Sequence, residues 1–267
     1  MTANYNLRPL WDAILEIYVA FADICKKHNL RFYATGGTAL GAMRHGGFIP
    51  WDDDFDLIMP RPDYIKFFEK YYKELPSHLS AEDFRTVPNH TFLHGKVFER
   101  RTEVIAKISD SSNLTLEQGI FIDIIPIDGM PKDNIPFYLW AWKRKVWRDY
   151  DYRGTLPFWK RLYSTVLGTC FMVPQNNIKR AVAFEKWLSK WNYDNSPAVE
   201  DLNANKRRLH DRAFTPETYG EPCWLKFENI EVPLPHDTEI FLSELFGDWR
   251  KMPPKEKQIP SHQIRNN

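Results

Sequence analysis

An acidic cluster directly before an apolar stretch is the feature that most restricts the fold of this chain. Asp52, Asp53, Asp54 and Asp56 lie within five residues, and from Asp54 to Met59 carboxylates alternate with apolar side chains. A period of two predicts a strand that points Asp54 and Asp56 to one face and its apolar side chains to the other. Carboxylates this close repel one another unless cations or protons lie among them. A solvated acidic turn is the plain alternative, against which the alternation argues.

A third carboxylate, Asp123, interrupts a later apolar run. A buried strand rarely carries a charge without a partner, so Asp123 is expected to complete a site with Asp54 and Asp56. Oxygen ligands without His or Cys favour Mg²⁺, or Mn²⁺, over Zn²⁺. An EF-hand calcium loop fits poorly, because Leu57 stands where glycine is needed and Asp63 where a bidentate Glu is needed.

The rest of the pattern predicts an α+β fold with a mixed β-sheet flanked by helices. A helix is expected from Leu7 to about His28, and another from Asp63 to Leu75. Strands are expected at 30–35, 54–59, 92–98, 103–109 and 119–129. The sequence then predicts a catalytic core formed by 1–130 and 221–267, with a helical, aromatic and basic region at 131–220 that walls the cleft and selects the acceptor.

A glycine pair precedes the acidic strand. Gly36, Gly37 and Thr38 stand between a predicted strand and a predicted helix, where backbone amides and the positive helix end can hold phosphate. A glycine pair by itself more often marks an ordinary turn. Joined to an Asp-x-Asp strand and a third carboxylate on a later strand, it resembles the layout of the nucleotidyltransferase superfamily.

The resemblance becomes more specific along the run YATGGTALGAMRHGGFIPWDDDFDLIMPRPDY, from Tyr33 to Tyr64. This run is similar to the signature of the LicD family of phosphocholine transferases, which includes the fukutin-related proteins. Further matches are GKVFERRT at 95–102, GIFIDIIPIDG at 119–129, GDWRKMPP at 247–254 and His262. Arg101 departs from the family, which usually carries Asn at that place.

The resemblance implies transfer of phosphocholine, or a related phospho-alditol or phosphoethanolamine group, from a CDP-activated donor to a sugar hydroxyl. The acceptor would be lipopolysaccharide, teichoic acid or a capsule. It also implies that Asp54, Asp56 and Asp123 hold one or two Mg²⁺ ions. A true nucleotidyltransferase that uses CTP or another nucleoside triphosphate, and a non-catalytic nucleotide- or glycan-binding module, remain alternatives.

Four further residues are candidates for substrate contact. Arg44 and Lys96 would neutralise phosphate charge, or else form ion pairs with the acidic strand. His45 would act as a base or contact the nucleotide, or else make a structural hydrogen bond. Trp51, next to the acidic cluster, is the best-placed ring for a cation–π contact with a choline head group.

The charge and composition of the chain limit the kinds of partner that it is expected to bind. The net charge of +1 gives no general attraction to nucleic acid, and three widely spaced cysteines favour a reduced cytoplasmic setting. No stretch is long and apolar enough to span a membrane. The segment 132–161 nevertheless holds eight basic residues against three acidic ones, with nine aromatics. Peripheral contact with the inner membrane or an anionic lipid-linked glycan is one expectation for it, and a solvated helical subdomain is the other.

Overall fold

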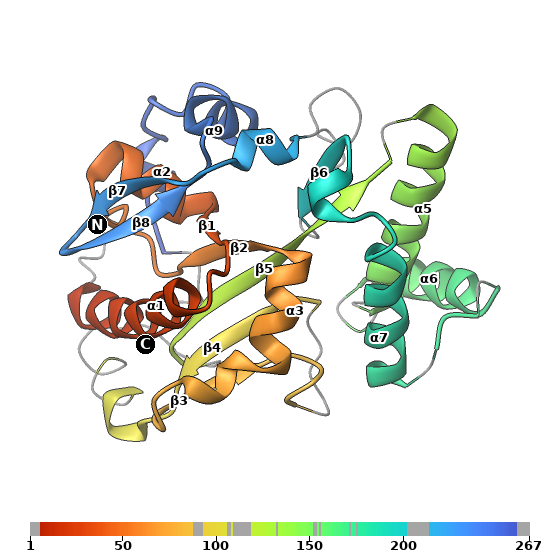
Figure 1. Cartoon of the computed structure of the whole chain (residues 1–267), viewed down its shortest axis with the longest axis horizontal. Helices are drawn as coiled ribbons and strands as arrows, with labels where there is room; N and C mark the ends of the chain where they lie inside the picture. Colours follow the sequence, from red (N-terminus) through yellow and green to blue (C-terminus); the bar gives the residue numbers. More distant parts are fainter. Residues whose placement is uncertain are drawn as a thin grey trace.

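A computed structural model gives the arrangement of most of the chain (Figure 1). It describes residues 6–87, 93–105, 108, 119–131, 133–151, 154, 156–170, 172–174, 176–201 and 214–260. Lys132 and Arg153, which contribute to the basic segment, and His262, which belongs to the family pattern, lie outside this part.

Six strands form one mixed sheet (Figure 1). The strand order is β1 (Tyr33–Ala34), β2 (Asp56–Pro60), β5 (Phe121–Met130), β4 (Gly95–Glu99) and β3 (Leu79–Glu82), and β6 (Ala198–Asp201) also pairs with β5. The β2–β5 pair is parallel, and the other pairs are antiparallel. The predicted α+β class, a mixed sheet flanked by helices, is confirmed.

Strand β5 is the centre of this sheet. Its first half pairs with β4, its second half pairs with β6, and β2 lies along its other edge. Its isoleucines Ile122, Ile124 and Ile127 are fully buried, as expected for a central strand covered on both faces. The β2–β5 register places Asp56 directly beside Asp123, which brings together two carboxylates from distant parts of the sequence.

Helices α1 and α3 are among those that pack on the sheet (Figure 1). α1 (Arg8–Lys27) buries an apolar stripe that recurs every three or four residues, including Leu10, Ile14, Ile17 and Phe21. α3 (Arg61–Glu69) has a proline in its first turn, where the fixed φ of proline suits a helix start. A short 3₁₀ turn, Tyr71–Glu74, follows α3 and completes the helix predicted to reach Leu75.

The last part of the chain returns to the N-terminal region. It forms α8 (Pro216–Tyr219), a hairpin of β7 (Cys223–Phe227) and β8 (Ile230–Leu234), α9 (Thr238–Phe246) and a 3₁₀ turn (Lys255–Lys257). Phe227 contacts Phe48 and Phe55 edge-on, with ring centroids 4.9 and 5.5 Å apart. Because Phe48 and Phe55 flank the acidic cluster, the hairpin supports the segment that carries it.

Three helices, α5 (Asn134–Asp151), α6 (Phe158–Cys170) and α7 (Asn177–Leu188), gather beside one end of the sheet (Figure 1). A 3₁₀ turn, Tyr193–Asn195, leads from them to β6. α5 and α7 contribute to an apolar cluster separate from the main core: Met130, Trp140, Trp147, Tyr150, Val173, Phe184, Leu188 and Ala198. Residues 131–220 thus contain helices and one sheet strand, and their division from the catalytic core stays a prediction.

Several predicted strands differ from those in the structure. The strand expected at 103–109 is wrong, because residues 102–105 form a helical turn in which the amides of Val104 and Ile105 donate to the Arg101 carbonyl; Ala106, Lys107 and Ser109 are outside the described part. Strand β4, which corresponds to the strand expected at 92–98, pairs with β3 and β5 instead. The strand expected at 30–35 is limited to β1, and the strand expected at 54–59 begins at Asp56.

A buried ion pair joins α3 to β5. The Arg61 guanidinium donates two hydrogen bonds to the Asp128 carboxylate, at 2.7 and 2.6 Å, and a third to Glu185 of α7 at 3.3 Å. Both partners of the main pair are almost fully buried. Arg61 therefore links the sheet, α3 and the helical region.

We predict that Arg61→Met lowers the free energy of unfolding by about 3–5 kcal/mol, because it leaves Asp128 buried and unpaired. Urea denaturation measures the change. Adding Asp128→Leu should recover much of the loss, whereas Arg250→Met, which breaks an exposed pair with Glu239, should change stability little. If Arg61→Met were as stable as the parent, the contacts of Arg61 would not be what holds α3, β5 and α7 together.

Candidate active site

The acidic cluster lies in the turn that leads into β2. Asp52, Asp53 and Asp54 each offer a carboxylate oxygen, and these three oxygens all lie within 4.8 Å of one another. The Asp52 amide donates to the Ile49 carbonyl at 2.8 Å, and the Trp11 indole of α1 donates to the Asp52 carbonyl at 2.8 Å. Backbone bonds and α1 thus hold together carboxylates that would otherwise move apart.

Two more carboxylates lie on the adjacent strands. Asp56 opens β2 and is paired in register with Asp123 of β5, while the Asp123 amide donates to the Phe55 carbonyl at 2.9 Å. Burial raises the pKa of Asp56 well above its ordinary value, and the charges of Asp54 and Asp123 raise it further. Phe55 and Leu57 are buried as predicted, but Ile58, on the same side of β2 as Asp56, is buried as well, and Asp54 lies before the strand.

The N-terminus of α2 (Gly36–His45) lies against these carboxylates. A Cβ at Gly36, whose φ is +55°, would lie 2.9 Å from an Asp56 carboxylate oxygen, and one at Gly37 would lie 2.4 Å from an Asp52 oxygen. Only glycine allows this approach. The buried Thr38 hydroxyl accepts a hydrogen bond from the Asp56 amide at 2.9 Å. The first amides of α2 have no intrahelical acceptor, which suits them to anions.

Two nitrogen-bearing side chains contact Asp123: Lys96 on β4 and His94 just before it. Lys96 Nζ lies 2.7 Å and His94 Nε2 lies 3.0 Å from the same Asp123 oxygen. Burial alone would raise the pKa of Asp123, but His94 and Lys96 outweigh it and the net pKa is lowered. Lys96 also lies 3.5 Å from the centroid of the Phe121 ring. Lys96 thus forms its ion pair with β5 rather than with the acidic strand, and its contact with phosphate stays a prediction.

Arg44 and His45 lie at the other end of α2, about 12 Å along the helix axis from Gly36. The Arg44 guanidinium donates to the carbonyls of Trp249 and Lys251, each at 3.3 Å, and to His45 Nε2 at 3.1 Å. Burial lowers the pKa of His45, and the Arg44 charge adds to the effect. Arg44 thus links α2 to the C-terminal tail by hydrogen bonds to backbone carbonyls, which are not ion pairs with the acidic cluster. The substrate roles of Arg44 and His45 stay predictions.

The sequence indicated Trp51 as a candidate site residue but did not indicate His94. Trp51 is half-buried and packs against the main core beside the cluster, and its contact with choline stays a prediction. His94, which reaches Asp123, was missed by sequence reasoning. The signal available was its spacing of two from Lys96, which places both side chains on one side of an extended segment.

The donor set fits a divalent, oxygen-preferring cation. Burial raises the pKa of Asp52 to about 9, and the charge of Asp54 is the next contribution. Carboxylates held this close cannot all ionise unless positive charge is added among them. The structure places Asp52, Asp53 and Asp54 in the tightest group, with Asp56 and Asp123 beside it. The ligand assignment to Asp54, Asp56 and Asp123 stays a prediction.

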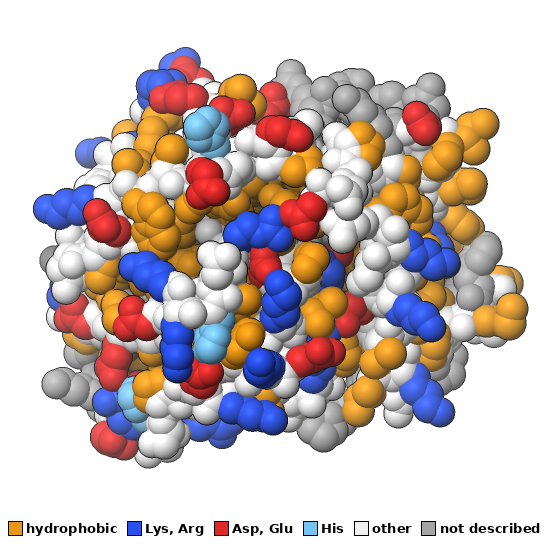
Figure 2. Space-filling model, in the orientation of Figure 1, with side chains coloured by type: hydrophobic (Ala, Val, Ile, Leu, Met, Phe, Trp, Pro, Cys, Tyr) orange, Lys and Arg blue, Asp and Glu red, His pale blue; other side chains and the backbone are white. Residues whose placement is uncertain are grey.

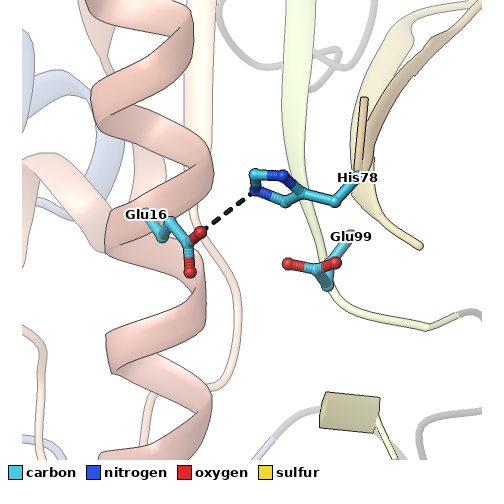
Figure 3. A group of neighbouring side chains, drawn as sticks. All are labelled: Glu16, His78 and Glu99. Atoms are coloured by element: carbon cyan, nitrogen blue, oxygen red, sulfur yellow. Dashed lines mark ion pairs between the residues drawn. The ribbon is translucent and has the colours of Figure 1, made fainter. Parts of the chain in front are cut away.

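A second mixed cluster, Glu16, His78 and Glu99, lies between α1 and the outer strands (Figure 3). His78 Nε2 lies 3.0 Å from a Glu16 oxygen. Arg101 bonds to both glutamates. Burial would raise the pKa of Glu99, but hydrogen bonds from Arg101 reverse this and lower it. Arg101, the departure from the family pattern, therefore supplies a positive charge to both glutamates and joins α1 to β4.

The raised pKa of Asp52 predicts how stability depends on pH. The folded carboxyl keeps its proton up to about pH 9, whereas the unfolded one ionises near pH 4, at its ordinary value. The metal-free protein should therefore lose stability as pH rises from about 4 to about 9, and Asp56 acts in the same direction. Thermal unfolding across this range measures it, and Mg²⁺ should stabilise the protein most at the alkaline end.

Asp52→Asn is the matched variant, because the amide keeps the shape of the side chain and cannot ionise. It should flatten the pH dependence, while Glu256→Gln, which changes an exposed acid, should leave it intact. A parent protein whose stability rises across this pH range would contradict the buried, protonated state of Asp52.

Comparisons with known proteins agree with this geometry. A model of the LicD/FKTN/FKRP nucleotidyltransferase domain matches residues 29–176. A protein of Haemophilus influenzae named lipopolysaccharide cholinephosphotransferase LicD is 25% identical over 274 residues, which cover 96% of each chain. Uncharacterized proteins of Rickettsia typhi and Rickettsia prowazekii are 42% identical over 56 and 54 residues, or 20% and 19% of this chain.

The domain match covers more than half of the chain and includes every carboxylate of the site. It also includes the glycine pair of α2 and the two side chains that contact Asp123, His94 and Lys96. The predicted resemblance is confirmed. This chain belongs to the LicD/FKTN/FKRP family of nucleotidyltransferase-domain proteins.

Proposed function

We propose that this chain transfers phosphocholine, or a related phospho-alditol or phosphoethanolamine group, from a CDP-activated donor to a sugar hydroxyl of a surface glycan. The observation that carries the proposal is the group of closely placed, mostly half-buried carboxylates against the N-terminus of α2, in a chain of this family. The printed name of the Haemophilus relative, which aligns over 96% of this chain, supports a lipopolysaccharide-type acceptor.

The proposed metal ligands are Asp54, Asp56 and Asp123, with Asp52 and Asp53 beside them. When bound there, Mg²⁺ or Mn²⁺ would neutralise the donor diphosphate and lower the pKa of the acceptor hydroxyl. The parallel pairing of β2 with β5 supports the set, because it fixes the spacing of Asp56 and Asp123 through the backbone. The lowered pKa of Asp123 keeps this carboxylate ionised.

The chain's own groups would bind and orient the donor. The free amides at Gly36, Gly37 and Thr38 are the proposed contacts for phosphate oxygens, since the positive end of α2 favours anions. Lys96 holds Asp123 in place and adds a positive charge beside the diphosphate. Trp51 is the proposed ring for the quaternary ammonium. The helical region 131–220 is proposed to contact the glycan or glycolipid acceptor.

We predict that Asp54→Asn lowers the rate of transfer from CDP-choline by at least roughly 100-fold, because it removes one of the charges that hold the metal. Release of CMP, with the acceptor glycan and Mg²⁺ present, measures the rate. Asp23→Asn, which changes an exposed carboxylate of α1, is the matched control and should keep full activity. Titration with CDP-choline, CDP-ethanolamine, CDP-ribitol and CTP identifies the donor.

Three outcomes would contradict the proposal. Full activity of Asp54→Asn would remove this carboxylate from the reaction. Consumption of CTP with release of pyrophosphate would make the chain a true nucleotidyltransferase. Tight, metal-dependent binding of a CDP-linked compound without turnover on any glycan would make it a binding module.

A further inference from the structure

Helix α6 turns its large apolar side chains outward. Phe158, Trp159, Leu162, Tyr163 and Val166 are all exposed, Trp159 by 76%. The buried face of the helix consists of Ser164 and Gly168. A Cβ at Gly168 would lie 2.0 Å from the Tyr150 ring, so α6 packs closely on α5 through its small residues. An ordinary surface helix has the opposite arrangement, with apolar residues inside.

The neighbouring helices extend this surface. On α5, exposed apolar residues recur at steps of three, one and three, which places them on one stripe: Ile135, Tyr138, Leu139 and Trp142. On α7, Ile178 and Val182 are exposed one turn apart, and Met172 before α7 is 87% exposed. Figure 2 shows hydrophobic side chains at the end of the molecule where α5 and α6 lie. We call these residues of α5, α6, α7 and Met172 the apolar face.

The structure distinguishes the buried aromatic side chains of this region from the exposed ones, which the sequence alone could not do. Trp140 and Trp147 are buried in the cluster to which α5 and α7 contribute, and Arg144 is buried as well. These residues fit the plain alternative of a helical subdomain. Trp142 and Trp159 instead point outward with the apolar face, which runs beyond the segment 132–161 as far as Val182.

Positive charge accompanies the apolar face. Lys160 and Arg161 of α6 are exposed, and α6 contains no acidic residue. On α7, Lys179 and Lys186 are exposed. The acidic residue of α7, Glu185, is turned away and bonds to the guanidinium groups of Arg61 and Arg85. Asp133, just before α5, is exposed near Ile135, whereas the exposed charge along α6 and beside Ile178 and Val182 of α7 is cationic.

We propose that the apolar face binds the surface of an anionic phospholipid bilayer. Outward Trp, Tyr and Phe side chains would enter the interfacial layer while Lys and Arg pair with lipid phosphates. Among the described residues, no helix is long and apolar enough to cross the membrane, so the contact is peripheral. A second copy of the chain fits less well, because a two-fold dimer through α6 would bring the Lys160 and Arg161 charges of both copies into one interface, where α6 offers no acidic residue to pair with them.

The test is co-sedimentation of the full chain with phospholipid vesicles. The protein should pellet with vesicles that contain phosphatidylglycerol, less with phosphatidylcholine alone, and less at high salt. Trp159→Glu combined with Leu162→Glu should weaken binding by about 100-fold or more. Lys160→Glu combined with Arg161→Glu should weaken it by about tenfold or more. Ile240→Glu, which changes an exposed apolar residue of α9, is the matched control.

A conservative variant shows whether a loss of binding reflects the removed side chain or a misfolded protein. Trp159→Phe should keep binding but lose part of the fluorescence quenching caused by brominated lipids. Vesicle binding that is absent, or that is the same in the glutamate variants, would overturn the proposal. So would a dimer in light scattering that Trp159→Glu dissociates while vesicles do not bind. Sedimentation needs neither donor nor metal, so its result is independent of the proposed transfer reaction.

Discussion

Repulsion among closely placed carboxylates is the constraint on which the rest of the structure depends. Asp52, Asp53 and Asp54 share one turn, and Asp56 and Asp123 lie beside them on paired strands. The fold surrounds this charge with the positive end of α2 and with Lys96 and His94. The C-terminal hairpin packs behind the turn through Phe227. The fold thus brings together a set of carboxylates that fits a cation before any ligand binds.

The pattern of neighbouring residues was sufficient to predict those parts of the site that lie within a single short segment of the chain. The period-two alternation predicted the buried positions of Phe55 and Leu57, and the position of Gly36 between strand and helix predicted a helix start beside the carboxylates. These features depend on side-chain direction and backbone freedom, which neighbouring residues largely set. The apolar strand around Asp123 was likewise recognisable from its own residues.

Features that depend on distant segments could not be predicted in the same way. The pairing of Asp56 with Asp123 depends on strand register, and His94 reaches Asp123 because β4 runs beside β5. β3 and β6 are four residues each, so their own sequence carries little periodicity. The same limit applies to the tryptophans of α5, because the packing of α7 decides that Trp140 is buried while Trp142 is exposed.

Metal binding at the carboxylates is the central claim, and anomalous diffraction from crystals soaked with Mn²⁺ and CDP-choline tests it most directly. The account predicts an anomalous peak in contact with Asp54, Asp56 and Asp123, with the donor diphosphate near the amides of Gly36 and Gly37. A well-ordered donor with no Mn²⁺ at these carboxylates, and with Asp123 still paired only to Lys96 and His94, would contradict it.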